Sequence, residues 1–176
     1  MTGVLFVDAL YDKNQEISQV IGSINCRKGH FACGIGCLEA AVDFRTEFKL
    51  RRGEPSEPLY NLRLDTAVIE PAIPICGPCF SDVKDKQKLG SFLSDYVNAD
   101  FLKECFDEAS GHKAGLLLVP LFKKMNPDAK ILIYTYLKED CPTGRSVKQY
   151  ADKFEVPVLY KPLGALGVLK ALGIET

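Results

Sequence analysis

The stretch Thr66-Ala67-Val68-Ile69-Glu70 decides the class of fold to which this chain belongs. An apolar run of this length, followed shortly by Pro74, is typical of a strand buried on both faces. Such a strand delivers the carboxylate of Glu70 to the loop at its carboxyl end. The groups that this carboxylate contacts must come from other segments of the chain.

Segments with strand and helix patterns alternate on both sides of this strand. Further strands are predicted at 4–7, 31–33, 130–135 and 156–160. Apolar side chains at helical spacing predict helices over 17–24, 38–48, 116–125, 147–154 and 163–172, with Pro120 either kinking its helix or lying in the first turn. This order favours an α/β fold, a doubly wound sheet of five parallel strands covered by helices on both faces.

Residues 76–112 are more than a minimal five-stranded domain needs. Their apolar residues recur at helical spacing in two groups, and Asn98 or Asp100 is suited to cap the second helix, with Gly111 to end it. We therefore expect a single domain over 1–176 with a helical hairpin inserted at about 76–112, on the loop side of the sheet.

Composition excludes several classes of protein. The 176 residues suit one domain with an insertion, and 47% apolar residues suffice for a core. The 22 Lys and Arg residues nearly balance 23 Asp and Glu residues, so no basic surface for nucleic acid is expected. No apolar stretch approaches the roughly 18 residues of a membrane span, and the N-terminus lacks a signal peptide. Seven cysteines then indicate free thiols in the cytoplasm.

Four polar residues follow the predicted strands. Asp8 follows the first strand, Glu70 the third and Lys161 the fifth, and Thr135 ends the fourth. Ligand chemistry in a doubly wound sheet gathers at the carboxyl ends of the strands. These four side chains are therefore the candidate site.

The same positions resemble the receiver (CheY-like) domain of two-component response regulators, over about 1–75 and 113–175. The resemblance rests on five motifs: Val7-Asp8, Gly36-Cys37-Leu38-Glu39-Ala40, Glu70 with Pro74, the segment from Asn126-Pro127 to Thr135, and Lys161-Pro162, a bond that is usually cis in the family. It implies a flavodoxin-like fold. It also implies a signalling role in which two acids and an acceptor aspartate hold Mg²⁺, while the lysine and threonine bind an acyl phosphate.

This chain departs from the family pattern at three positions. The second metal-binding acid is Ala9, the acceptor is Glu70, and the aromatic residue expected three before Lys161 is Val158. Asp12 lies past the strand end, where we expect it to be solvated. The weakened Mg²⁺ site and the longer acceptor side chain predict that ordinary phosphotransfer is lost.

The resemblance therefore implies an atypical, non-enzymatic receiver. If Glu70 reaches Lys161, its carboxylate would stand where phosphoryl oxygens bind, as in a permanently occupied site. We expect a protein partner (a kinase, an output domain, a regulator or a second copy of this chain) at the last strand–helix surfaces or the inserted hairpin. No binding to nucleic acid or membrane is expected.

Cys76-Gly77-Pro78-Cys79 supports a different hypothesis. This tetrapeptide is similar to the redox motif of thioredoxins, in which a helix N-terminus activates the first thiol, and Val156-Pro157 resembles their cis-proline segment. Alternatively, Cys33 and Cys37 join Cys76 and Cys79 to hold zinc or an iron–sulfur cluster. A third interpretation is that these are buried apolar side chains.

Overall fold

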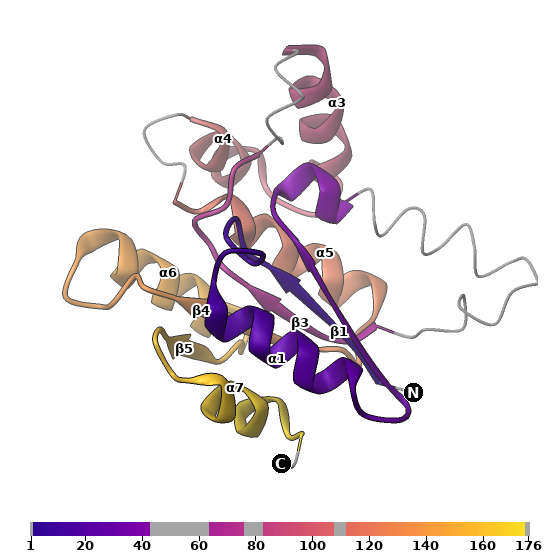
Figure 1. The fold of residues 1–176 in the computed structure, drawn as a ribbon. Helices are drawn as coiled ribbons and strands as arrows, with labels where there is room; N and C mark the ends of the chain where they lie inside the picture. The colour runs from indigo at the N-terminus through magenta and orange to yellow at the C-terminus, as the bar shows by residue number, and fades with distance from the viewer. Residues whose placement is uncertain (1, 43–63, 76–82, 108–111, 175–176) are drawn as a thin grey trace, which may run out of the picture.

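The computed structural model describes residues 2–42, 64–75, 83–107 and 112–174 (Figure 1). Five strands form one sheet in the order β2-β1-β3-β4-β5. Their bounds are Thr2–Val7, His30–Ile35, Leu64–Ile69, Lys130–Thr135 and Val158–Tyr160 for β1 to β5. Every neighbouring pair is parallel, which confirms the predicted fold class.

Helices cover both faces of this sheet (Figure 1). On one face α1 (Gln15–Asn25) and α7 (Ala165–Leu172) pack over Val4, Phe6 and Tyr134. On the other, α5 (Leu118–Met125), α6 (Pro142–Lys153) and the helical residues 38–42 pack over Leu5, Val7 and Ile133. Because successive strand residues point to opposite faces, each fully buried strand contributes to both cores.

The first turns of α1 and α6 are each capped by the side chain of the residue before the helix. Asn14 accepts hydrogen bonds from the Glu16 and Ile17 N–H groups at 3.0 and 3.4 Å and caps α1. The sulfur of Cys141 accepts the Gly144 N–H at 3.3 Å, and Pro142 follows as the first residue of α6. These caps place both helix starts earlier than the apolar spacing had predicted.

The strand β5 is shorter than expected, since it begins at Val158 and not at Val156. The Val156 N–H donates to the Ala151 carbonyl at 2.9 Å, so this residue is still bound to the last turn of α6 and not to the sheet. Pro157 has no N–H to donate to a sheet. The strand therefore starts one residue after the proline.

The segment before β4 is also irregular. A 3₁₀ turn, η3 (Ala114–Leu117), precedes α5, so the predicted helix begins two residues later than expected. Pro120 lies in the first turn of α5, where its missing N–H has no helical acceptor. This confirms one of the two positions predicted for Pro120.

The insertion contains α3 (Val83–Leu93) and α4 (Ala99–Phe106), which lie on the side of the molecule away from α7 and add buried residues to the core under α5 (Figure 1). Asn98 caps α4 by accepting the Phe101 N–H at 2.8 Å. The Phe101 ring stacks on Tyr150 of α6, with centroids 4.3 Å apart. The helical prediction is thus confirmed for α3 and α4, whereas Gly111 lies outside the described residues.

Candidate functional site

The four candidate residues meet at one edge of the sheet. The Glu70 N–H donates to the Val7 carbonyl at 2.8 Å, and the Lys161 N–H donates to the Thr135 carbonyl at 2.9 Å. Each residue therefore continues the ladder of its strand. Asp8, Glu70, Thr135 and Lys161 are only 6, 7, 0 and 4% exposed, so their polar groups must find partners within the protein.

The ammonium group of Lys161 links the two carboxylates. Its Nζ donates to Glu70 Oε2 at 2.9 Å and also contacts Asp8 Oδ2. The remaining Asp8 oxygen, Oδ1, accepts the Leu10 N–H at 2.8 Å. Lys161 therefore has two buried anionic partners.

The second oxygen of Glu70 is also occupied. Thr135 Oγ1 donates to Glu70 Oε1 at 2.7 Å, and the Ala72 N–H donates to the same oxygen at 3.2 Å. Thr135 Oγ1 in turn accepts the Leu137 N–H at 3.1 Å. The Glu70 side chain is thus held by a lysine, a threonine and a main-chain amide.

The protonation state of Lys161 follows from two opposing effects. Burial lowers the pKa of an ammonium group, but the charge of Glu70 and the hydrogen bonds and charge of Asp8 and Glu70 outweigh this, and the pKa of Lys161 is raised. The rings of Tyr134 and Tyr136 each lie 5.2 Å from Nζ and add a cation–π attraction. Lys161 therefore remains charged.

Gly115, which the sequence analysis did not single out, packs against the main chain of Glu70. The Gly115 N–H donates to the Pro71 carbonyl at 3.0 Å. A Cβ atom at position 115 would lie 2.2 Å from the Glu70 carbonyl oxygen. Only glycine permits η3 to approach the end of β3 this closely.

Sequence reasoning also missed Tyr134, Tyr136 and Glu16, which surround the site. The two tyrosines flank Thr135 and could have been found from that position alone. Glu16 lies in the first turn of α1, and nothing in the sequence connects it with β4. Its relevance depends on a contact between residues 118 positions apart.

The donor set at this edge does not fit a magnesium ion. Both carboxylates already contact Lys161, position 9 is an alanine, and Asp12 is exposed to solvent as expected. Mg²⁺ requires oxygen ligands in near-octahedral geometry. Throughout the described ranges, no group of three or more His, Cys, Asp or Glu side chains could hold a metal.

The structure places only half of the predicted thiol cluster. Cys33 lies on β2, where burial raises its pKa to about 11, and Cys37 is buried with its sulfur accepting the Ala40 N–H at 3.4 Å. A raised pKa disfavours the thiolate that metal binding or nucleophilic attack requires. Cys76 and Cys79 lie outside the described residues, so their pairing stays a prediction.

The thioredoxin-like alternative is wrong about the fold. A thioredoxin-like fold would have a mixed sheet, whereas all described strand pairs here are parallel. The only cis peptide bond in the described segments joins Lys161 to Pro162, as the receiver resemblance implies, and Pro157 follows a trans bond. Pro157 lies where the chain passes from α6 into β5, and β4 separates β5 from β3 in the sheet.

Solved structures of response regulators share this architecture. One is the response regulator DrrB, a Thermotoga maritima OmpR/PhoB homologue, with a TM-score of 0.51 and 12% identity over 98% of this chain and 51% of that chain. Another is RcsB from Salmonella enterica serovar Typhimurium, bound to promoter rprA in the presence of the phosphomimetic BeF₃⁻, with a TM-score of 0.53 and 11% identity over 99% and 67% of the two chains. The fold is receiver-like.

This likeness concerns the fold alone, because the identities are low. The receiver-like chain described here spans about half the length of DrrB and two thirds of that of RcsB. No family model matches the sequence, and no curated protein matches it either. In the described part of the chain, no helix has the length and apolar character needed to cross a bilayer.

Proposed function

We propose that this chain is an atypical receiver-like signalling domain that acts through protein–protein contacts without ordinary aspartyl phosphorylation. One observation carries the proposal: the Glu70 carboxylate contacts both Thr135 Oγ1 and Lys161 Nζ, at 2.7 and 2.9 Å. In receivers these two groups are expected to bind the acyl phosphate. Glu70 thus stands in for the phosphoryl oxygens and gives the site a permanently occupied character.

The surroundings of Glu70 also oppose its use as a nucleophile. A carboxylate attacks a phosphodonor through a free oxygen, whereas each Glu70 oxygen already accepts a hydrogen bond from a buried or main-chain donor. Among the residues that the structure describes, no group of three or more His, Cys, Asp or Glu side chains is placed to hold a metal that would neutralise an incoming phosphoryl group. The domain is therefore proposed to be non-enzymatic.

Exposed apolar side chains support binding of a protein partner. The large hydrophobic residues that are exposed in the described segments lie in the loops after β1, β4 and β5 and at the start of α7: Leu10, Tyr136, Leu163 and Leu166. The last two belong to the final strand–helix surface predicted to bind a partner. We propose that a kinase, an output domain, a regulator or a second copy of this chain contacts them.

The remaining features of the proposal concern the whole chain. We propose a single domain over 1–176, located in the cytoplasm, with the insertion at about 76–112 supplying contacts particular to this protein. A net charge of −1 disfavours direct binding of nucleic acid by this domain.

The test is incubation of the full chain with acetyl phosphate and Mg²⁺, followed by intact mass measurement. We expect no phosphoryl adduct on the wild type. A matched variant, Ala9→Asp with Glu70→Asp, restores two family residues and shortens the side chain that occupies the site. We expect this double variant to gain an acid-labile adduct.

An acid-labile adduct on wild-type Glu70 or Asp8 would overturn the proposal. A double variant that stays unmodified, although folded, would show that something other than these two residues prevents phosphotransfer. Circular dichroism of both proteins controls for folding.

A further inference from the structure

A second hydrogen-bonded cluster lies beside the candidate site, on the face of the sheet covered by α1 and α7. It joins three elements: Glu16 in α1, Tyr134 in β4 and Leu163 in the turn after β5. The Tyr134 hydroxyl donates to Glu16 Oε1. The Leu163 N–H lies 3.1 Å from both Glu16 Oε1 and the Tyr134 oxygen.

Two members of this cluster are covalent near neighbours of the site. Leu163 follows Lys161 by two residues, and Pro162 between them is rigid in φ. Tyr134 precedes Thr135 in β4, and its ring lies 5.2 Å from Lys161 Nζ. A shift of either residue would therefore be passed to the groups that hold Glu70.

The tyrosine acts as a hydrogen-bond donor at every physiological pH. Burial raises the pKa of Tyr134, and its hydrogen bond to Glu16 raises it further. The ring is 1% exposed and packs in the core below α1 and α7. Packing therefore holds the ring in one position, from which its hydroxyl donates to Glu16.

Glu16 has a more ordinary role that must be separated from this one. A carboxylate in the first turn of a helix is stabilised by the helix dipole. That role needs only the charge. The contacts with Tyr134 and Leu163 need an acceptor oxygen, which a glutamine also provides.

We propose that Glu16 and Tyr134 are positioning residues that hold the Lys161 segment from the α1–α7 face. This inference rests on the proposed function only in taking Lys161 as the residue to be positioned. It connects the exposed side chain of Leu163 with the buried ammonium, so that a partner bound there would act on Lys161 through the Leu163 main chain.

The test is competitive acetylation of the full chain with acetic anhydride, read lysine by lysine by peptide mass spectrometry. Lys170 is exposed and serves as the internal reference. In the Glu16→Ala variant we expect the rate at Lys161 relative to Lys170 to rise about fivefold, the factor for losing one net hydrogen bond. Glu16→Gln keeps the acceptor and should retain the wild-type ratio.

A matched control removes a tyrosine–glutamate hydrogen bond that is just as near to Lys161 in the sequence but does not belong to this cluster. Tyr160 Oη donates to Glu139 Oε1 at 2.8 Å on the exposed side of β5, and Tyr160→Phe should leave the Lys161 ratio unchanged. The proposal is overturned if Glu16→Ala leaves the ratio unchanged, if Glu16→Gln behaves like Glu16→Ala, or if Tyr160→Phe has the same effect.

If Glu16→Ala fails to fold, Tyr134→Phe decides the question on the same ratio. It removes the Tyr134–Glu16 hydrogen bond and should raise the ratio by a similar factor, because in either variant the Leu163 N–H keeps one of its two acceptors. An unchanged ratio would then overturn the inference. A phosphoryl adduct on the wild type would defeat the proposed function while leaving this measurement intact, so the two failures are distinguishable.

Discussion

Lys161 shows how one residue can be buried with its charge. Its side chain is 2% exposed, yet it contacts two carboxylates that are themselves 8% exposed. A buried ion cluster contributes little net stability compared with apolar residues of similar size. Removing one member is costly, however, because the others remain buried without a partner.

The residue-scale prediction is that Lys161→Met destabilises the protein at neutral pH. Asp8 and Glu70 would face each other without a cation, and we expect the free energy of unfolding to fall by about 3–5 kcal/mol. Urea denaturation measures this change. Lys170→Met, at an exposed lysine of α7, is the control and should have no measurable effect. A loss below about 1 kcal/mol would show that the cluster is open to water.

At the scale of elements, the contact between η3 and the end of β3 determines where Glu70 is held. The two elements approach so closely that the Glu70 carbonyl occupies the space of a side chain at position 115. Main-chain atoms on both sides leave no flexible group that could give way. This contact fixes the main chain of Glu70, while Thr135 and Lys161 hold its carboxylate.

We predict that Gly115→Ala destabilises the protein by about 1–3 kcal/mol, because β3 and η3 must separate. Gly22→Ala is the matched control, since a Cβ in the middle of α1 meets nothing within 4 Å. It should stabilise the protein by about 0.5–1 kcal/mol. Thermal denaturation of both variants tests the pair, and equal effects would contradict the close contact.

A second element-scale prediction concerns the insertion, which contacts α6 through the stacked rings of Phe101 and Tyr150. Phe101→Ala should weaken this contact by about 2 kcal/mol. Amide exchange should then increase over α3 and α4 while β1 and β3 stay protected. Leu166→Ala, at a side chain that is 69% exposed, removes similar apolar surface without this effect. Uniform exchange across the chain would mean that the insertion is not separately docked.

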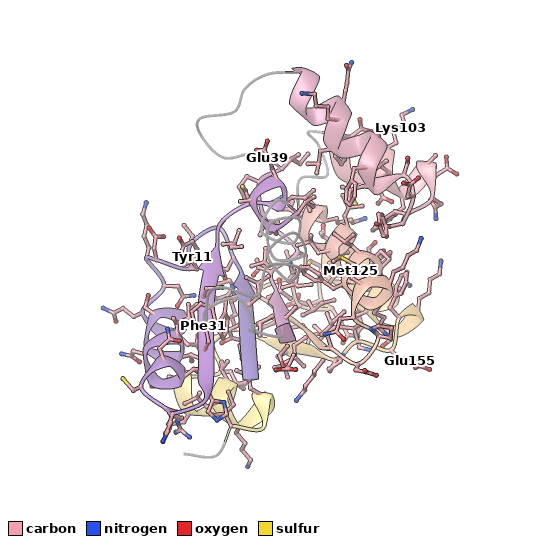
Figure 2. All side chains as sticks on the ribbon, turned by 90° about the vertical axis from the view of Figure 1, so that its right-hand side faces the viewer. Tyr11, Phe31, Glu39, Lys103, Met125 and Glu155 are labelled. Atoms are coloured by element: carbon pink, nitrogen blue, oxygen red, sulfur yellow. The ribbon has the colours of Figure 1, made fainter. Side chains whose placement is uncertain are left out.

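At the scale of the whole molecule, the two faces of the sheet differ in the groups that they bury. Figure 2 shows Tyr11 beside β2 on one side of the molecule, and Met125 and Lys103 toward the other. The core under α5 and α6 contains Cys105, whose pKa is raised to about 12 mainly by burial, with the charge of Glu104 adding to it. This core therefore favours neutral thiols, as β2 does at Cys33.

The whole-molecule prediction is a loss of stability in alkali. Between the ordinary cysteine pKa of 9.0 and the raised values of about 11 and 12, the unfolded chain loses thiol protons that the folded chain keeps, so unfolding becomes easier as pH rises. Lys161 acts in the same direction, because its stabilisation is complete below its ordinary pKa of 10.5 and is lost as pH rises through the folded value.

Comparing the wild type with a thiol variant by urea denaturation between pH 8 and 10 isolates the thiol contribution. The double variant Cys33→Ala, Cys105→Ala should show a shallower decrease in the free energy of unfolding than the wild type over this range. Parallel curves would contradict the burial of these thiols. Cys26→Ala, at an exposed cysteine, is the control and should follow the wild type.

The type and order of the elements could be predicted from the amino-acid pattern alone. Short apolar runs alternating with helical patterns require a parallel sheet covered on both faces, and such a sheet brings the carboxyl ends of its strands to one edge. Asp8, Glu70 and Lys161 could be placed together for this reason. The approximate lengths of most helices followed from the same patterns, because burial of one face imposes the 3.6-residue period.

The contacts between these groups could not be predicted in this way, because they depend on tertiary packing. Whether Glu70 reaches both Thr135 and Lys161 depends on distances between strands that are 65 and 91 residues apart in the sequence. The same holds for the close approach of Gly115 and for the hydrogen bond from Tyr134 to Glu16. Periodicity specifies the direction in which a side chain points, but contacts of a few ångströms depend on how separate elements pack.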